Sequence, residues 1–341
     1  MKKIRIEDAV GQTLCHDMTG ITDGKKGVLF KRGHQIRNED IPRLLDIGKS
    51  HIFAWEPDAD EVHEDDAAIA VAEASCGSGI TYDKTPSEGK IFIYAGQRGL
   101  FHLDRAALRG INSVGDYTIA CLPDMTDVAE GTKLGGIRIV PLVTKGENVR
   151  VAVEIAKRSY PVFTVIPYKN LKCGVIITGS EVYQGRIEDK FEPIMRKKLE
   201  KYEADVIDVT KCPDDLDMIL DAIKSLIERG AELILLTGGM SVDPDDLTPT
   251  AIRSTGARVV TQGMPMQPGN MLTIAYLGST ALIGVPGASM HSPVTSLDVF
   301  LPRVFAGIEI TKDDIPGLGE GGFCSGCAEC TYPRCYFGRG I

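Results

Sequence analysis

Two spacings of hydrophobic residues alternate along residues 171–310. Continuous apolar runs are typical of buried strands, and apolar residues three or four positions apart are typical of one helix face. These patterns predict strands over 174–178, 204–209 and 233–236, and helices over 189–202 and 216–227, the last ending at Gly230. Strands that alternate with helices favour right-handed crossovers and a parallel sheet covered on both faces.

The end of this region predicts a hairpin and a last helix. Residues 271–276 and 280–285 flank the turn Leu277-Gly278-Ser279, so we expect an antiparallel edge there. Residues 291–305 have the spacing of a helix. Together these elements predict an α/β fold over 171–312, with three layers (αβα) and a mostly parallel sheet.

Two smaller regions come before it. Residues 1–60 predict a small α+β unit with a strand–turn–strand over 27–36, a helix over 39–47 capped by Asn38, and a strand over 51–55. Residues 61–170 show a mixed period and predict an inserted mixed α/β or β-rich region. Its expected elements are strands over 90–94, 135–143, 150–153 and 162–166, and helices over 67–74 and 106–109.

Composition narrows the class of protein. A chain of 341 residues is long enough for two or three domains, and 43% hydrophobic with 25% charged residues is typical of a globular protein. A net charge of −9 argues against a broad nucleic-acid interface. The N-terminus shows no signal-peptide pattern, and no apolar run reaches membrane-spanning length. We therefore expect a cytoplasmic protein that binds neither nucleic acid nor a membrane.

Three glycine-bearing turns follow three of the predicted strands. They are T-G-S-E-V (178–182), T-G-G-M-S-V-D-P-D-D (237–246) and V-P-G-A-S (285–289). Because the carboxyl ends of parallel strands meet at one edge of a sheet, we expect these turns to converge on a ligand site. A further proline–glycine turn, M-P-M-Q-P-G-N-M (264–271), precedes the third.

The second turn combines features of two kinds of ligand site. Gly238 and Gly239 let the backbone approach a ligand closely. Thr248 is expected to cap a helix with Pro249 in its first turn, and a helix N-terminus favours a phosphate. The acidic residues of this loop favour Mg²⁺ and are Asp243, Asp245 and Asp246. The alternative is an ordinary crossover loop whose acids are solvated.

These four motifs resemble the molybdopterin-binding domain of molybdenum cofactor biosynthesis. The resemblance covers about residues 171–310 and is nearest to the molybdopterin molybdenumtransferases. The molybdopterin adenylyltransferases carry the same domain, and D-L-T-P (246–249) also occurs in that branch. A weaker resemblance to the molybdenumtransferases covers 27–56, whereas 62–170 does not match the family.

The resemblance implies roles for individual residues. Asp246 is implied as the catalytic residue and, with Asp243, as a magnesium ligand. The implied contacts to the pterin and its phosphate are Thr178, Gly179, Glu181, Gly238, Gly239, Ser241, Pro268, Gly269, Asn270, Pro286 and Gly287. Three positions depart from the family. Ser180 replaces a usual aspartate, and Asn270 and Met271 replace a lysine and a proline. The missing lysine would suit an oxyanion such as molybdate.

The implied activity is insertion of molybdenum into adenylylated molybdopterin, with Mg²⁺-dependent release of AMP. Three alternatives stay open: adenylylation of molybdopterin, a chaperone or sensor that binds molybdopterin or Mo-molybdopterin without catalysis, and an unrelated nucleotide-binding protein. The implied partners are a small pterin phosphate or its nucleotide adduct, and a molybdoenzyme that receives the cofactor. The family resemblance and the expected edge hairpin favour a homodimer.

A tail rich in glycine and cysteine follows at 313–341. Residues 317–322 are expected to be a flexible linker. The spacing C-x2-C-x2-C of Cys324, Cys327 and Cys330 resembles part of an iron–sulfur site, and Cys335 comes four residues further on. A four-thiolate zinc site, a site completed by a partner, and unstructured thiols are the alternatives.

Overall fold

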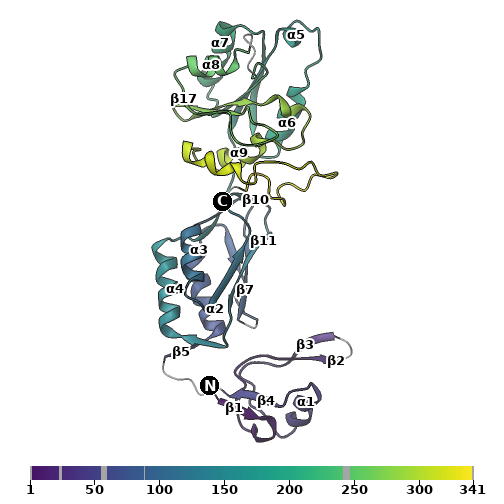
Figure 1. Cartoon of the computed structure of the whole chain (residues 1–341), viewed down its shortest axis with the longest axis vertical. Helices are drawn as coiled ribbons and strands as arrows, with labels where there is room; N and C mark the ends of the chain where they lie inside the picture. The colour runs from purple at the N-terminus through teal and green to yellow at the C-terminus, as the bar shows by residue number, and fades with distance from the viewer. Residues whose placement is uncertain (1, 23–24, 55–59, 88, 241–245, 340–341) are drawn as a thin grey trace. The chain divides into compact units, whose positions relative to one another are not determined.

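The computed structural model describes residues 2–22, 25–54, 60–87, 89–240 and 246–339 (Figure 1). The chain divides into two compact units. Unit 1 comprises Met1–Gln97, Phe101–Leu122 and Ala129–Val165, and unit 2 comprises Arg98–Leu100, Pro123–Val128 and Ile166–Ile341. Among the residues described, no helix has the length and apolar character needed to cross a membrane.

Unit 2 is built on a six-stranded sheet of order β15-β14-β16-β19-β18-β17. Its strands are β14 (Lys172–Thr178), β15 (Asp205–Cys212), β16 (Leu233–Thr237), β17 (Arg258–Gln262), β18 (Thr273–Leu277) and β19 (Thr280–Val285). The first four strands in that order run parallel, whereas β18 and β17 pair antiparallel. The mostly parallel sheet predicted from the sequence is therefore confirmed.

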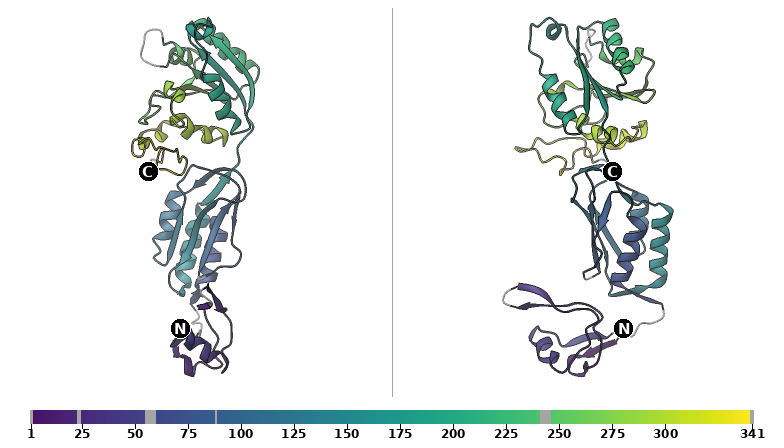
Figure 2. Two further views of the ribbon diagram at one scale, coloured as in Figure 1. Left: turned by 90° about the vertical axis from the view of Figure 1, so that its right-hand side faces the viewer. Right: turned by 180° about the vertical axis from the view of Figure 1, so that it is seen from behind.

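Helices cover both faces of this sheet (Figures 1 and 2). Val175, Leu235 and Ile283 pack in one core with α6 (Phe191–Glu200) and α9 (Ser296–Phe305). Alternate residues pack in a second core with two other helices, α7 (Leu216–Glu228) and α8 (Thr248–Ser254). Successive side chains of a strand point to opposite faces, so strands that are apolar throughout need a helical layer on each side. This is the three-layer αβα arrangement.

Two predicted helix starts in unit 2 are wrong. Thr248 is the first residue of α8 and its N-cap is Leu247, because the Thr248 hydroxyl donates instead to the Gly238 carbonyl. The helix predicted from residue 291 begins at Ser296, because Thr295 and Asp298 form a capping box there. A short 3-10 helix, η2 (Gly287–Met290), lies between β19 and that cap.

Unit 1 contains a four-stranded antiparallel sheet of order β6-β7-β11-β9 and several smaller sheets. Its strands are β1 (Lys2–Arg5), β2 (Met18–Thr22), β3 (Lys25–Phe30), β4 (His51–Ala54), β5 (Glu61–His63), β6 (Ile80–Tyr82), β7 (Lys90–Ala95), β9 (Tyr117–Cys121), β11 (Lys133–Ile139) and β12 (Val143–Lys145). Its helices are η1 (Ile6–Asp8), α1 (Asp40–Asp46), α2 (Glu64–Ser75), α3 (Arg105–Asn112) and α4 (Gly146–Arg158). Strands β8 (Gly99–Leu103), β10 (Thr126–Val128) and β13 (Phe163–Ile166) lie where the chain passes between the two units.

Two predictions in unit 1 are also wrong. The strand predicted over 150–153 lies inside helix α4, whose Ala152 and Ala156 are fully buried at the four-residue spacing of a helix face. Asn38 does not cap α1, since the N-cap is Glu39. The N–H of Arg37 donates to the Asp40 carboxylate at 2.9 Å, so the acid in the first turn binds the preceding backbone.

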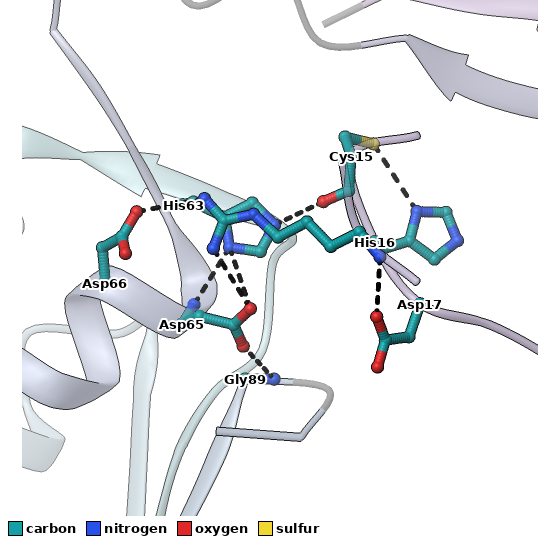
Figure 3. A network of polar contacts seen from close by, with 8 residues as sticks. Cys15, His16, Asp17, His63, Asp65, Asp66 and Gly89 are labelled. Atoms are coloured by element: carbon teal, nitrogen blue, oxygen red, sulfur yellow. Dashed lines mark hydrogen bonds and ion pairs between the residues drawn. The ribbon is translucent and has the colours of Figure 1, made fainter. Parts of the chain in front are cut away.

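The buried side chain of His63 caps the N-terminus of helix α2 (Figure 3). The ring of His63 is 1% exposed, and its Nε2 lies 2.6 Å from the Cys15 carbonyl while its Nδ1 accepts the Asp65 N–H at 3.1 Å. Burial disfavours the charged ring and lowers the pKa of His63. Arg32 pairs with Asp65 and Asp66, at 3.2 Å each, and these three side chains border a polar cavity of about 530 Å³.

The tail packs on unit 2 after η3 (Lys312–Asp314) and η4 (Pro316–Gly319). The Gln267 N–H donates to the Gly322 carbonyl at 2.8 Å, and the Cys324 N–H donates to the Gln267 carbonyl at 2.7 Å. Phe337 is 2% exposed and belongs to the core under α9. Residues 317–322, expected as a linker, thus form a helical turn followed by a strand-like pairing.

Candidate functional site

The turns predicted to converge begin along one edge of the sheet in unit 2. Strands β14, β16 and β19 are neighbours and run parallel, and their register pairs Ile177 with Thr237 and Thr237 with Val285. The turns that start at Gly179, Gly238 and Pro286 therefore leave the sheet side by side. We call these turns, with the turn at 267–270, the rim.

Buried hydroxyl groups connect the first two turns. Thr178 is 4% exposed and its Oγ1 donates to the Thr237 carbonyl at 3.1 Å. Thr248 is fully buried, and its Oγ1 donates to the Gly238 carbonyl at 2.8 Å and lies 3.2 Å from the Thr178 Oγ1. The start of α8 is thereby fixed against the ends of β14 and β16. Thr178 holds the turns together through its hydroxyl rather than presenting it to solvent.

The paired glycines are required by this close packing. Gly238 has a φ of +84°, and a Cβ on it would stand 2.2 Å from the Thr178 carbonyl oxygen. Gly239 has a φ of +50°, and a Cβ on it would stand 3.1 Å from the Thr248 hydroxyl. Glycine adopts positive φ more readily than any other residue, so both residues serve the turn's conformation.

The turn at 267–270 is attached to the start of α9. The Ser296 Oγ donates to the Gly269 carbonyl at 2.6 Å, and the Ser296 N–H donates to the Pro268 carbonyl at 3.2 Å. Gly269 has a φ of +108°, and a Cβ there would lie 2.4 Å from the Ser296 Oγ. Because α9 follows the turn at 285–289, these contacts place the fourth turn beside the third.

Charged groups fix the loop between β19 and α9. Asp298 accepts the Thr295 N–H at 2.8 Å and pairs with Lys198 of α6 at 2.5 Å. The Lys198 and Asp298 side chains are 12% and 17% exposed, so water screens this pair less than a surface pair. The hydroxyls of Ser289 and Thr295 lie 3.2 Å apart and join the two ends of the loop.

One acid beside the rim was missed in the sequence analysis. Strand β15 is the parallel neighbour of β14, and Cys212 pairs in register with Thr178. Just beyond it, the Asp214 carboxylate accepts the Ser180 N–H at 2.8 Å, and the Asp214 N–H donates to the Ser180 Oγ at 3.2 Å. Asp214 lies five residues beyond the strand predicted over 204–209, whereas β15 extends to Cys212, so the sequence analysis did not connect Asp214 with the rim. Asp214 supplies a carboxylate beside Ser180, the position at which the resemblance implies an aspartate.

The predicted catalytic and metal residues have different positions. Asp246 is half-buried and precedes α8, whereas Glu181 is exposed in the short helix α5 (Ser180–Tyr183). Ser241, Asp243 and Asp245 lie outside the described residues. In the parts of the chain that the structure describes, no three His, Cys, Asp or Glu side chains form a group that holds a metal ion.

The remaining predicted contacts lie along the turns. Gly287 and Asn270 are exposed, Pro268 and Gly179 are half-buried, and Pro286 is buried. The Gly179 N–H donates to the Cys212 carbonyl at 3.2 Å, so this N–H is already occupied. The Asn270 carbonyl accepts the Met264 N–H at 2.8 Å, which fixes the backbone of the turn and leaves the side chain at the surface.

Two domain families match the chain. The family described as "Probable molybdopterin binding domain" matches residues 174–306, which contain the six-stranded sheet except for the first two residues of β14. A "Domain of unknown function (DUF8806)" matches residues 3–56 in unit 1.

Curated relatives include molybdopterin molybdenumtransferases. The protein from Staphylococcus aureus (strain COL) is 27% identical over 165 residues, which are 46% of this chain and 38% of the relative. The protein from Synechococcus elongatus is 24% identical, over 49% of this chain and 44% of the relative. The chain thus matches less than half the length of these relatives.

Solved structures with a similar domain include two proteins named MoaB. The molybdopterin biosynthesis enzyme MoaB from Thermus thermophilus is 21% identical, covers 39% of this chain and 91% of its own, and has a TM-score of 0.33. The tungsten cofactor synthesizing protein MoaB from Pyrococcus furiosus is 20% identical, covers 40% and 94%, and has a TM-score of 0.30. From the domain match and the curated relatives we conclude that residues 174–306 of this chain form a domain of the molybdopterin-binding family.

Proposed function

We propose that this chain acts in molybdenum cofactor biosynthesis and that its rim binds molybdopterin, free or adenylylated. The observation that carries the proposal is the register of β14, β16 and β19, which starts three glycine turns side by side. In open α/β sheets, ligands bind at the carboxyl ends of the strands, where loops of neighbouring strands enclose them. The family match covers all three turns.

In this proposal, backbone N–H groups of the rim bind the phosphate, and buried threonine hydroxyls hold the turns in position. In the proposal, the N–H groups of Gly238, Gly239 and Gly287 hold the phosphate of the pterin, since glycine admits an anion close to the backbone. The Thr178–Thr248 contact at 3.2 Å keeps the turns in place. Thr178 thus acts as a positioning residue in this proposal.

The proposed reaction is that of a molybdopterin molybdenumtransferase, which cleaves the phosphoanhydride of adenylylated molybdopterin and releases AMP. Such a cleavage depends mainly on positioning and on neutralising phosphate charge. Asp246 is proposed to orient the attacking oxygen, because it is half-buried and stands between the glycine pair and α8. Asp214, which is bonded to Ser180, holds the neighbouring turn.

Magnesium belongs to this proposal as a charge-neutralising ion. Asp246 and Asp243 are its proposed ligands, because oxygen donors suit Mg²⁺. Asp243 lies outside the described residues, and the described side chains by themselves do not complete a site. When bound, the ion would neutralise phosphate oxygens, while the chain's own residues position the substrate.

Turnover tests the proposal directly. The full chain is incubated with adenylylated molybdopterin, molybdate and Mg²⁺, and released AMP is measured. We expect AMP release from the wild type and a loss of at least about 100-fold in Asp246→Asn, as for removal of a positioned catalytic carboxylate. Asp221→Asn, an exposed change on α7, is the matched control and should retain wild-type turnover. Full turnover in Asp246→Asn would remove the catalytic assignment.

A binding protein without catalysis is the second candidate, and Asn270 favours it. The exposed amide of Asn270 carries no charge to attract molybdate, whereas the usual lysine would. Tight pterin binding without release of AMP would select this function. ATP-dependent adenylylation of free molybdopterin would instead select the adenylyltransferase activity.

A further inference from the structure

The four cysteines of the tail border a single cavity in unit 2. Its volume is about 280 Å³, and Cys324, Cys327, Cys330 and Cys335 all line it. The opposite wall comes from Pro268 of the fourth turn and from residues 292–294 after β19. Four cysteine thiols, here from a segment of twelve residues, are a donor set that proteins use for zinc and iron–sulfur centres.

The segment that carries these cysteines is held at both ends. The Gly338 N–H donates to the Gly321 carbonyl at 3.0 Å, which closes a loop over 321–338. The Cys324 N–H donates to the Gln267 carbonyl at 2.7 Å, and the Tyr332 hydroxyl donates to the Asp298 carbonyl at 3.1 Å. The loop is thus built onto the domain, which argues against unstructured thiols.

The four thiols differ in exposure. Cys324 and Cys335 are half-buried and pack against the core under α9, whereas Cys327 and Cys330 are exposed. All four are free thiols. Two packed and two exposed donors around one cavity leave an opening through which a cofactor can be inserted.

The size of the cavity favours a cluster over a single ion. A zinc ion with four Zn–S bonds of about 2.3 Å draws its thiolates to roughly 3.8 Å from one another. The four cysteines line a cavity of about 280 Å³. A space of this size suits a guest of several atoms.

The spacing of the cysteines along the chain also favours a cluster of several atoms. C-x2-C-x2-C is the run that supplies three ligands of a four-iron cluster in bacterial ferredoxins, and the fourth cysteine of that run serves a second cluster. In this chain Cys335 follows after four residues and lines the same cavity as the other three. All four ligands therefore come from one loop of this chain.

We propose that Cys324, Cys327, Cys330 and Cys335 bind an iron–sulfur cluster of the [4Fe–4S] type in this cavity. The cluster borders the fourth turn through Pro268 and the loop after β19 through residues 292–294. This site is independent of the proposed transferase activity, because none of its ligands is a rim residue.

Reconstitution of the full chain tests the proposal. Anaerobic protein is incubated with ferrous iron and sulfide and desalted, and its iron and acid-labile sulfide are measured. We expect about four irons and about four sulfides per chain, with a paramagnetic signal after reduction. Zinc bound without sulfide, a stable disulfide between tail cysteines, or no retained metal would each overturn the proposal.

Variants at the exposed cysteines locate the site. Cys327→Ser/Cys330→Ser removes two ligands that do not pack in the core, and bound iron should fall from about four to below about one per chain. Cys121→Ser, outside the tail, is the control and should keep the full iron content. Circular dichroism shows that each variant is folded. Undiminished iron and sulfide in the double variant would contradict the assignment.

Discussion

Gly238 lies against the backbone of Thr178 so closely that a Cβ on Gly238 would stand 2.2 Å from the Thr178 carbonyl oxygen. The two residues belong to the turns after β16 and β14, which are neighbours in the sheet. The two turns can lie this close together only because Gly238 has no side chain. The shape of the proposed pterin site therefore depends on glycine at this position.

We expect Gly238→Ala to weaken molybdopterin binding by at least about tenfold. The alanine adds a positive-φ cost of about 1 kcal/mol and a backbone clash that separates the turns. The measurement is the dissociation constant of molybdopterin for each folded variant. Gly256→Ala is the matched control, since Gly256 has a φ of +78° with nothing within 4 Å of its Cβ position. Equal affinities in the two variants would show that the close contact is unimportant.

Thr248→Val should destabilise unit 2 by about 1–3 kcal/mol, because the Gly238 carbonyl loses its buried hydroxyl donor. The start of α8 would also lose its contact with Thr178. Unfolding in urea, followed by a probe in unit 2, measures the change. Thr250→Val is the control, since the Thr250 Oγ1 accepts an exposed bond from Arg253, at 2.9 Å. A Thr248→Val variant as stable as the control would contradict the role of this hydroxyl.

Phe337→Ala should release the tail from unit 2. Removing a large buried ring costs about 3–5 kcal/mol, and Phe337 is 2% exposed. Limited proteolysis within 321–338 should then become roughly 100-fold faster, since local opening exposes the loop. Phe323→Ala is the comparison, because Phe323 is 64% exposed and its removal leaves the packing intact. Unchanged cleavage in Phe337→Ala would mean that other contacts hold the tail.

His63 should make unit 1 less stable in acid. Its pKa is lowered chiefly by burial, so the unfolded chain takes up the proton first. The stabilisation is complete above the ordinary pKa of 6.5 and is lost as the pH falls below it towards the folded pKa. Melting temperatures measured from about pH 7.5 to pH 5 should therefore fall less steeply in His63→Gln than in the wild type. His51→Gln, at an exposed histidine, should lose melting temperature with falling pH as the wild type does. If the melting temperatures of all three proteins fall equally, burial of His63 is not the cause of the acid sensitivity.

The α/β domain was predictable because its strands are apolar on both faces. Leu233 to Leu236 are fully buried, as an unbroken apolar run predicts for a central parallel strand. The parallel direction of β14, β16 and β19 then follows from the helices between the strands, and the common edge follows from that direction.

Other features could not be predicted, because they depend on contacts between residues that lie far apart in the sequence. The sequence predicts a strand over 150–153, but Ala152 and Ala156 bury one face of helix α4. Thr248 looked like a helix cap, yet its hydroxyl bonds Gly238, ten residues earlier in the chain. The pairing of Asp214 with Ser180 joins residues 34 positions apart. None of these partners could be identified before the register of the strands was known.

The central claim is that molybdopterin binds where β14, β16 and β19 end. The most direct measurement is a crystal structure of the full chain with molybdopterin bound. We expect the pterin phosphate against the backbone of Gly238 and Gly239, with Asp246 beside it. Pterin density elsewhere, for example in the polar cavity beside Arg32 and Asp65, with the glycine turns empty, would contradict the claim.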